Sequence, residues 1–343
     1  MRKTTALALA GVTALSACSD GGRLLQPTSE PRLDVAGAFG SKIAFTSDWD
    51  APGTSTEIYV VNADGTGERQ ITSTAGNSNG PAWSPNGRSI AFHSNRGGGG
   101  FGGSDIYVVS ASDPSDVQRL TYLTGALGGA HFANWSPDGR KVVFNSFWPG
   151  QAKRDIYVID VDGTGLTKLT QDPDPLVPID DIRPDWSPDG SRIAFQSNRS
   201  VIEDPVTGSK SRNHDIYLMN PDGSGVVQLT SHAATDAAPE WSPDGKRIAF
   251  QSDRDGNDDI WVMEADGSGL VQLTDNSVRD AKPSWSPDGK RIAFHRDVAY
   301  LGEVHAELFT MNVDGSDVRM LSVPSFEGFH GFPSWGQGHD AVP

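Results

Sequence analysis

The sequence predicts an all-β protein, a six-bladed β-propeller of four-stranded antiparallel blades, and three observations lead to this prediction. The phrase Trp-Ser-Pro-Asp-Gly recurs, with Asn in place of Asp in the first copy, at 83–87, 135–139, 186–190, 241–245 and 285–289. After each copy come an Ile-Ala-Phe-like segment, an Asp-Ile-Tyr-like segment and a Leu-Thr-like ending. Successive tryptophans, up to Trp335, lie 52, 51, 55, 44 and 50 residues apart, which suits four short strands per repeated unit.

The Ser-Pro-Asp-Gly part of the phrase predicts a tight turn between two strands. Proline presets φ near −65° at the second position, Asp or Asn tolerates the third, and glycine accepts the left-handed exit. Each tryptophan therefore ends the first strand of a unit, and the Ile-Ala-Phe-like segment forms the second. A sixth, degenerate copy at 335–338 keeps the tryptophan but not the turn residues.

The order of these marks predicts how the ring closes. The first recognisable segment, 42–46, is a second strand, and the last, 331–335, is a first strand without the rest of its unit. We expect the C-terminal strand to become the innermost strand of the first blade, since this removes an open sheet edge. Strand alternation places Ile and Phe on one face and Ala on the other, so the bulky face of one blade should pack on the small face of the next.

Outside the repeat, the sequence predicts three further segments. Residues 1–17 have a basic start, an apolar centre and a small-residue end, as in a secretory signal peptide. Residues 18–39 lack periodicity and are rich in turn-forming residues, which predicts a flexible tether. The propeller is expected over 40–338, followed by a short tail over 339–343.

The end of the predicted signal peptide, Leu15-Ser16-Ala17-Cys18, resembles the lipobox of bacterial lipoproteins. The resemblance implies cleavage before Cys18 and a lipid anchor on its thiol, and Ser19 implies sorting to the outer membrane. Cys18 is the only cysteine, so no disulfide can form within the chain. The alternative is an ordinary cleaved signal peptide with an incidental thiol.

The charge of the chain narrows its choice of partners. A net charge of −16 argues against a nucleic acid, because binding to phosphates requires a basic surface. Cationic partners or metal ions fit such a surface better. The simpler interpretation is that acidic side chains keep an envelope protein soluble.

The complete phrase, from Pro-x-Trp-Ser-Pro-Asp-Gly through Ile-Ala-Phe and Asp-Ile-Tyr to Leu-Thr, resembles the TolB-like β-propeller repeat of bacterial envelope proteins. The resemblance covers roughly residues 40–338. It implies a protein of the bacterial envelope that binds an envelope protein or peptide. We expect the chain to be monomeric and periplasmic, and we expect it to be non-enzymatic because no convincing nucleophile or general-base pair stands out in the sequence. The alternative considered is a metal-assisted lyase or hydrolase that acts on a polysaccharide at the mouth of the central channel.

The loops are expected to divide between two faces of the propeller. The Ser-Pro-Asp-Gly and Asp-Gly turns are short and uniform, whereas the variable loops share the opposite face, around the mouth of the channel. Aromatic residues are favoured at the centres of interfaces, so the aromatic residues in these loops are the candidates for partner binding: Trp49, Phe101, Phe147, Trp148, Tyr300 and Phe329. The alternative is that they only pack the loops onto the ring.

A second set of candidates stands five residues before successive tryptophans, where the innermost strands begin. Asp181, Asp236, Asp280 and His330 would converge there and offer ligands for a divalent cation such as Ca²⁺. The alternative is that these aspartates accept hydrogen bonds from loop amides. The arginines of the recurring Ser-x-Arg, such as Arg199, are expected to form ion pairs with the acids that open the third strands.

Overall fold

The computed structural model describes residues 41–48, 55–74, 76–97, 103–123, 128–147, 153–171, 178–203, 210–300, 302–321 and 329–337. The chain divides into two units, 1–34 and 35–343, and every described residue belongs to the second. The predicted signal peptide, tether and tail, with Cys18, lie outside the described residues. In the ranges that are described, no helix is long and apolar enough to cross a membrane.

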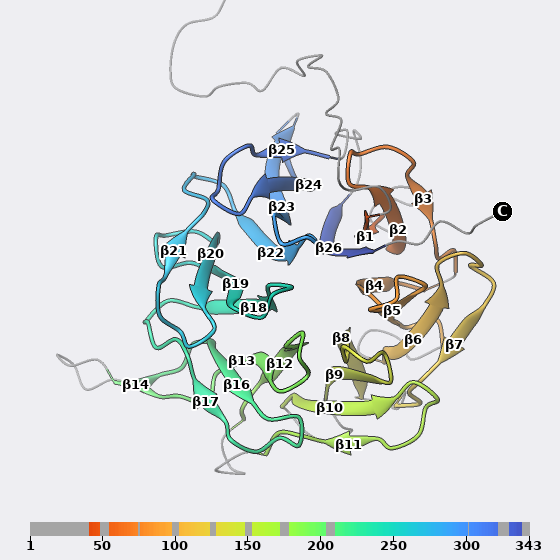
Figure 1. The fold of residues 1–343 in the computed structure, drawn as a ribbon, viewed down its shortest axis with the longest axis horizontal. Coiled ribbons are helices and arrows are strands. Elements are labelled where there is room, and N and C mark those ends of the chain that lie inside the picture. The colour runs from red at the N-terminus through yellow and green to blue at the C-terminus, as the bar shows by residue number, and fades with distance from the viewer. Residues whose placement is uncertain are drawn as a thin grey trace, which may run out of the picture. The chain divides into compact units, whose positions relative to one another are not determined.

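Six four-stranded antiparallel sheets surround a common centre, as Figure 1 shows. The innermost strands are β26 (His330–Gln337), β4 (Ser78–Trp83), β8 (Gly129–Trp135), β12 (Asp181–Trp186), β18 (Asp236–Trp241) and β22 (Asp280–Trp285). The second strands are β1 (Ser41–Ser47), β5 (Ser89–Ser94), β9 (Lys141–Phe147), β13 (Ile193–Ser197), β19 (Arg247–Ser252) and β23 (Arg291–Tyr300). The predicted fold, a six-bladed β-propeller, is confirmed.

The two outer positions of each blade hold the remaining strands. The third strands are β2 (Glu57–Asn62), β6 (Asp105–Ser110), β10 (Asp155–Asp160), β16 (Asp215–Met219), β20 (Asp259–Glu264) and β24 (Glu303–Asn312). The fourth strands are β3 (Arg69–Gln70), β7 (Val117–Arg119), β11 (Thr167–Lys168), β17 (Val227–Gln228), β21 (Val271–Gln272) and β25 (Arg319–Met320). A separate hairpin, β14 (Ile202–Glu203) and β15 (Lys210–Ser211), extends from the fourth blade.

The C-terminal strand closes the ring in the predicted way. β26 pairs antiparallel with β1, and Trp335 lies opposite Ile43 in the register. The first blade therefore has the order β26-β1-β2-β3 and combines both ends of the described chain. In Figure 1, β26 and β1 lie side by side, between the blade of β22 to β25 and the blade of β4 to β7.

The core consists of layers between neighbouring blades. Ala194 and Ile216 of the fourth blade pack against Trp241, Ile248 and Phe250 of the fifth, and each other pair of neighbouring blades has an equivalent cluster. The bulky face of the second strand thus meets the alanine face of its neighbour, which confirms the predicted alternation of large and small side chains.

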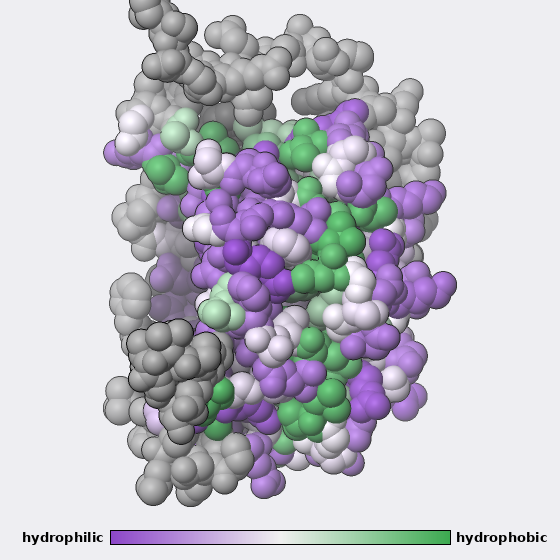
Figure 2. Space-filling model, turned by 90° about the vertical axis from the view of Figure 1, so that its left-hand side faces the viewer, coloured by the Kyte–Doolittle hydropathy of each residue, from purple (hydrophilic) through white to green (hydrophobic). Residues whose placement is uncertain are grey.

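The rim of the ring carries both polar and apolar side chains. Figure 2 shows apolar side chains in a band along one flank, bordered by hydrophilic ones. The fourth strands expose part of their apolar residues at the rim, with Val227 and Val271 each 53% exposed. These edge strands are only two or three residues long, and short edges limit unwanted pairing with other chains.

Candidate functional site

A cavity of about 520 Å³ lies between the innermost strands of all six blades. From each blade it is lined by the residues around Pro-x-Trp, and from five of them also by the proline of the Ser-Pro turn. This is the half of the channel nearest the Ser-Pro-Asp-Gly turns. The repeated phrase, which the sequence analysis assigned to turns and core, therefore also lines the central cavity.

Each innermost strand has a β-bulge at this level. In every blade one residue of the bulge adopts a left-handed backbone conformation, with φ between 53° and 58°: Gly80, Phe132, Arg183, Ala238, Lys282 and Phe332. The register with the second strand shifts at the same point in all six pairs. In five blades the next residue is proline, which a sheet tolerates at a bulge because the ladder hydrogen bond is already interrupted.

The bulges are held by side chains from the preceding blade. The backbone N–H of Ala238 donates to Oε1 of Gln196 at 2.8 Å, and that of Arg183 donates to Oδ1 of Asn145 at 3.2 Å. Gly80 and Phe132 are held in the same way by Thr46 Oγ1 and His93 Nδ1. The acceptor is always the residue that follows the Ile-Ala-Phe-like segment, so the second strand of one blade positions the cavity wall of the next.

The bulge residues bring cationic and aromatic groups together across the channel. The guanidinium carbon of Arg183 lies 3.8 Å from the centroid of the Phe132 ring and 5.6 Å from that of Phe332. The two phenyl rings are 6.0 Å apart. Lys282 lines the same cavity from the sixth blade. Residues 132, 183, 282 and 332 belong to four different blades, and only closure of the ring makes them neighbours.

Both cations lack a counter-ion within the described part of the chain. The side chains of Arg183 and Lys282 form no hydrogen bond or ion pair with a described residue. Burial, and then the charges of Arg279 and Arg154, lowers the pKa of Arg183 to about 9. Burial, followed by Arg183 and Arg279, lowers the pKa of Lys282 well below its usual value, and Asp258 opposes this shift only weakly.

The histidines nearest this group are buried and uncharged at neutral pH. Burial is the main cause that lowers the pKa of His131 to about 4, and it also places the pKa values of His93 and His295 well below 6.5. The neighbouring Arg279 is already paired with Asp258 at 2.7 Å. The cationic character of the channel therefore rests on Arg183 and Lys282.

Two carboxyl groups line the cavity nearer the Ser-Pro turns. Asp185 accepts hydrogen bonds from Asn134 Nδ2 at 2.5 Å and from the backbone N–H of Trp241 at 2.7 Å. Glu240 accepts from Ser284 Oγ and from the backbone N–H of Trp285, both at 2.9 Å. These acids connect neighbouring blades through the backbone of the repeated tryptophans.

Burial changes the protonation of this acid pair. The pKa of Asp185 is raised to about 7 because the carboxyl group is removed from water. The pKa of Glu240 is raised well above its usual value by burial and then by the neighbouring charge of Asp185. The two carboxyl groups therefore carry less than two negative charges at neutral pH.

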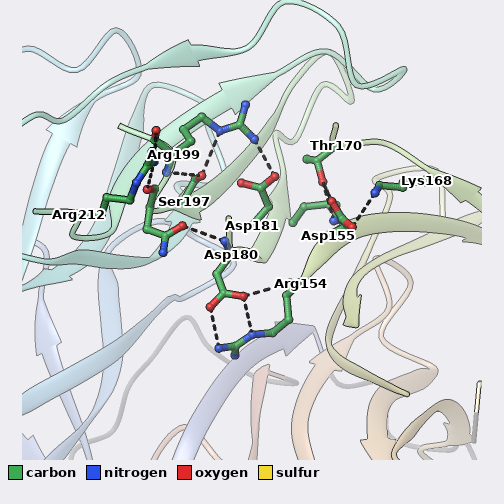
Figure 3. A network of polar contacts seen from close by, with 11 residues as sticks. Arg154, Asp155, Lys168, Thr170, Asp180, Asp181, Ser197, Arg199 and Arg212 are labelled. Atoms are coloured by element: carbon green, nitrogen blue, oxygen red, sulfur yellow. Dashed lines mark hydrogen bonds and ion pairs between the residues drawn. The ribbon is translucent and has the colours of Figure 1, made fainter. Parts of the chain in front are cut away.

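The residues predicted to bind a metal lie apart from this cavity wall. Asp181, Asp236 and Asp280 are fully buried, and each accepts an ion pair from an arginine of its own blade. Figure 3 shows one of these pairs, in which Arg199 Nη2 lies 2.7 Å from Asp181 Oδ2, beside the separate pair of Arg154 and Asp180. His330 contacts Glu307 at 3.0 Å.

In the described ranges, no three His, Cys, Asp or Glu residues are placed close enough together to hold a metal ion. A metal site, and a metal-assisted lyase or hydrolase, stays a prediction of the sequence.

The expected pairing of the arginines with third-strand acids is wrong. Arg199, Arg254 and Arg296 bind the aspartates that open the innermost strands. The third-strand acids instead accept hydrogen bonds from the threonine of Leu-Thr, as when Thr121 Oγ1 donates to Asp105 Oδ1 at 2.8 Å. Thr121 can reach Asp105 because Asp105 opens the third strand of its blade and Thr121 lies just beyond the end of the fourth.

Of the six aromatic candidates, the structure describes the side chains of two. Phe147 stacks on His131 with ring centroids 5.9 Å apart, and Phe329 lies 5.8 Å from Phe332. Both therefore contact the ring system that continues to Phe132 in the cavity wall. Trp49, Phe101 and Trp148, and the side chain of Tyr300, lie outside the described residues.

Sequence reasoning missed the bulge residues and the acid pair. The signal in the sequence is the variation inside the repeated phrase, where the residue before Pro-x-Trp is Arg183 in one copy, Lys282 in another and Gly80 in a third. Strand alternation alone does not reveal a bulge, so these positions could not be assigned to the cavity.

The fold and its central cavity define the class of protein: a β-propeller in which every blade has the same bulge, whereas the side chain at the bulge differs from blade to blade. Residues 205–337 match the family model of the TolB beta propeller domain. Among solved structures, TolB from Acinetobacter baumannii has a TM-score of 0.68 at 23% sequence identity, covering 88% of this chain and 67% of that chain. The chain thus carries a TolB-like β-propeller, as the repeat predicts.

Two curated relatives are similar over part of their length. Dipeptidyl-peptidase 5 of Porphyromonas gingivalis is 30% identical over 240 residues, which are 58% of this chain and 34% of the relative. An uncharacterized protein of Agrobacterium fabrum is 30% identical over 177 residues, 49% of this chain and 52% of that protein. The chain therefore spans about a third and about half of the length of these relatives.

Proposed function

We propose that this protein is a lipid-anchored propeller of the bacterial envelope that binds a protein or peptide partner through the mouth of its central channel. The observation that supports this proposal is the continuity of the aromatic surface. Phe147 and Phe329, at the variable-loop end, contact His131 and Phe332. Phe332 in turn contacts Phe132, which lines the cavity. A partner segment that docks on the loop face can therefore continue along aromatic rings toward the centre.

The similarity to TolB also supports the proposal that the propeller binds a protein or peptide. The fold is a rigid ring, and its loops and channel walls differ from blade to blade. Binding sites are commonly carried by variable segments on such a scaffold, and aromatic side chains supply a large contact area at the centre of an interface. The partner is expected to be an envelope protein or a peptide segment of one, bound by a monomeric propeller without catalysis.

The test is affinity capture with the mature protein immobilised through an N-terminal tag in place of its anchor. Envelope extract of the bacterium that encodes the chain is passed over wild type and over Phe147→Ala/Phe329→Ala. Proteins retained by wild type should be depleted at least ~10-fold on this variant, because two central aromatic contacts together contribute several kcal/mol.

The matched control is Val227→Ala/Val271→Ala, which removes exposed apolar side chains from the rim instead of the mouth. It should capture the same proteins as wild type. Melting curves of all three proteins confirm that the ring is folded. Equal recovery on wild type and the mouth variant would exclude binding through this face.

A further inference from the structure

The bulge positions carry side chains that the fold itself does not require. Gly80 and Ala238 form the same left-handed bulge as the other four blades, with φ of 58° and 53°. Any residue with a Cβ is strained in this conformation, alanine included, so the strain belongs to the bulge and not to the longer side chains. The fold accepts glycine or alanine at this position, and Arg183 and Lys282 therefore add side chains that the bulge does not need.

These two cations also lack an internal partner. In the described part of the chain their side chains form no ion pair, although Arg199 and Arg296 in the same two blades each bind a buried aspartate. This is the more notable because the whole chain has a net charge of −16, so acidic partners are abundant elsewhere. Both side chains are half-buried and line the channel, so their charged groups are available to a ligand that enters it.

The carboxyl groups in the same cavity are already engaged. Asp185 and Glu240 each accept two hydrogen bonds from neighbouring blades, and the donors include the backbone N–H groups of Trp241 and Trp285. Asp258, whose charge opposes the lowering of the Lys282 pKa, is bound by Arg279 and by Gln251 Nε2. None of these acids is placed as the counter-ion of Arg183 or Lys282.

The rings of Phe132 and Phe332 position the guanidinium group of Arg183 in the channel. Its guanidinium carbon lies 3.8 Å from the Phe132 centroid, at cation–π distance. Stacking uses the flat face of the guanidinium and leaves its N–H edge for a planar acceptor, which a carboxylate meets with two parallel hydrogen bonds. Lys282 and Arg183 line the same cavity from different blades, so a carboxylate bound at the guanidinium edge of Arg183 would lie in a cavity that also presents an ammonium group.

We propose that Arg183 and Lys282 form an anion-binding site at the centre of the channel, which takes a carboxylate carried next to an aromatic or apolar group that packs on Phe132 and Phe332. The inference rests on the proposed function in one respect: the carboxylate belongs to the peptide segment of the partner. A free small dicarboxylate offers the same chemistry, and the experiment separates these two sources.

The test is calorimetric titration of the mature protein at low ionic strength, where charge pairs are least screened. The probes are the blocked tripeptide acetyl-Glu-Phe-Glu-amide, its glutamine counterpart acetyl-Gln-Phe-Gln-amide, and free glutarate. Wild type should bind the glutamate peptide at least ~10-fold more tightly than the glutamine peptide, as expected for charge-assisted hydrogen bonds. Glutarate should bind more weakly because it lacks the ring. Tighter binding of glutarate than of the peptide would contradict a peptide ligand.

The variant Arg183→Gln/Lys282→Gln should lose this preference and bind the glutamate peptide at least ~10-fold more weakly. Its melting temperature should stay close to that of wild type, since both side chains are half-buried and neither forms an ion pair with a described residue. Arg183→Lys/Lys282→Arg keeps both charges and should keep most of the binding. The matched control Arg140→Gln/Lys246→Gln removes two exposed cations from the Ser-Pro-Asp-Gly turns and should bind as wild type does.

Two results would overturn the proposal. One is that wild type binds the glutamate and glutamine peptides with the same affinity. This measurement uses the wild-type protein alone, so it does not depend on whether a variant folds. The other is the same affinity of wild type and Arg183→Gln/Lys282→Gln for the glutamate peptide. Either result leaves partner capture through Phe147 and Phe329 intact, whereas failure of that capture alone leaves carboxylate binding intact. The two proposals therefore fail separately.

Discussion

Asp185 and Glu240 show how single residues in a repeated frame acquire different chemistry. Both stand directly before a repeated tryptophan, where Ser284 and Ser334 make the equivalent hydrogen bonds in other blades. Serine connects two blades without a charge. The two acids do so at the expense of burying carboxyl groups, which raises the pKa of Asp185 to about 7. The stability of this part of the ring should therefore depend on pH.

The variant Asp185→Asn tests this dependence. Between about pH 4 and pH 7 the folded state binds more protons at Asp185 than the unfolded state does, so the contribution of this group to the free energy of unfolding falls as pH rises through that window. Asparagine does not ionise and keeps an oxygen for the Trp241 N–H. Relative to Asp185→Asn, wild type should lose on the order of 3 kcal/mol between about pH 4 and pH 8, as measured by urea unfolding.

Asp189, in the turn that follows, provides the control. It is exposed, and hydrogen bonds from Ser187 and then Ser191 lower its pKa. Its protonation changes only at the acidic end, so Asp189→Asn should leave the pH dependence above about pH 5 as it is in wild type. A constant stability difference between wild type and Asp185→Asn across this range would show that Asp185 does not titrate there.

At the residue scale, prediction from sequence succeeded for the core and was incomplete for the site. Phe250 and Ile248 were assigned to the core from strand alternation, and both are fully buried. Arg183 and Lys282 were not recognised, because a bulge interrupts the alternation and turns a residue into the channel. Asp181 was placed correctly at the start of its strand, but its partner Arg199 comes from the neighbouring strand of the blade.

Among the elements, β26 is the strand that closes the ring. It completes the first blade by pairing with β1, and it contacts the blades on both sides: Ser334 Oγ accepts from the N–H of Trp83, and Trp335 N–H donates to Ser284 Oγ. The sequence predicted this strand from a degenerate copy of the phrase. The partner of β26 in its blade, β1, comes from the other end of the described chain instead of from a turn that follows Trp335.

A chain that ends at Ser325 tests the contribution of this strand. It lacks β26, exposes the inner edge of β1 and loses the buried ring of Trp335, which alone is worth about 3 to 5 kcal/mol. The expected result is loss of the cooperative thermal transition, measured by circular dichroism. A chain that ends at Gly338 keeps the whole of β26 and should melt as the full chain does. If both shortened chains melt at the wild-type temperature, closure by β26 does not stabilise the ring.

At the scale of the whole molecule, the proposed lipid anchor determines where the propeller works. Cys18 follows a segment that resembles a lipobox, and acyl chains on its thiol would hold the protein at a membrane. A tether over 18–39 would then separate the ring from the lipid surface. The net charge of −16 would keep the propeller away from anionic headgroups.

The variant Cys18→Ser tests the anchor. Full-length wild type, expressed in a Gram-negative host, should sediment with the membranes, whereas Cys18→Ser should be recovered almost entirely in the soluble fraction. The mature propeller of both proteins should give the same circular dichroism spectrum, because the change lies outside the repeat. Incorporation of a labelled fatty acid into wild type alone confirms the chemistry. The same distribution of both proteins between membrane and soluble fractions would exclude anchoring through Cys18.

The six blades, their strand order and the closing role of 331–335 follow from the amino-acid sequence, because turn residues and strand alternation are local properties that repeat along the chain. The residues that face the central cavity are known only from the folded ring. Phe132, Arg183, Lys282 and Phe332 come from four blades and meet only when the ring closes, and each reaches the channel through a bulge that a neighbouring blade holds in place. Local patterns carry no information about such convergence, since it depends on the curvature of the whole ring.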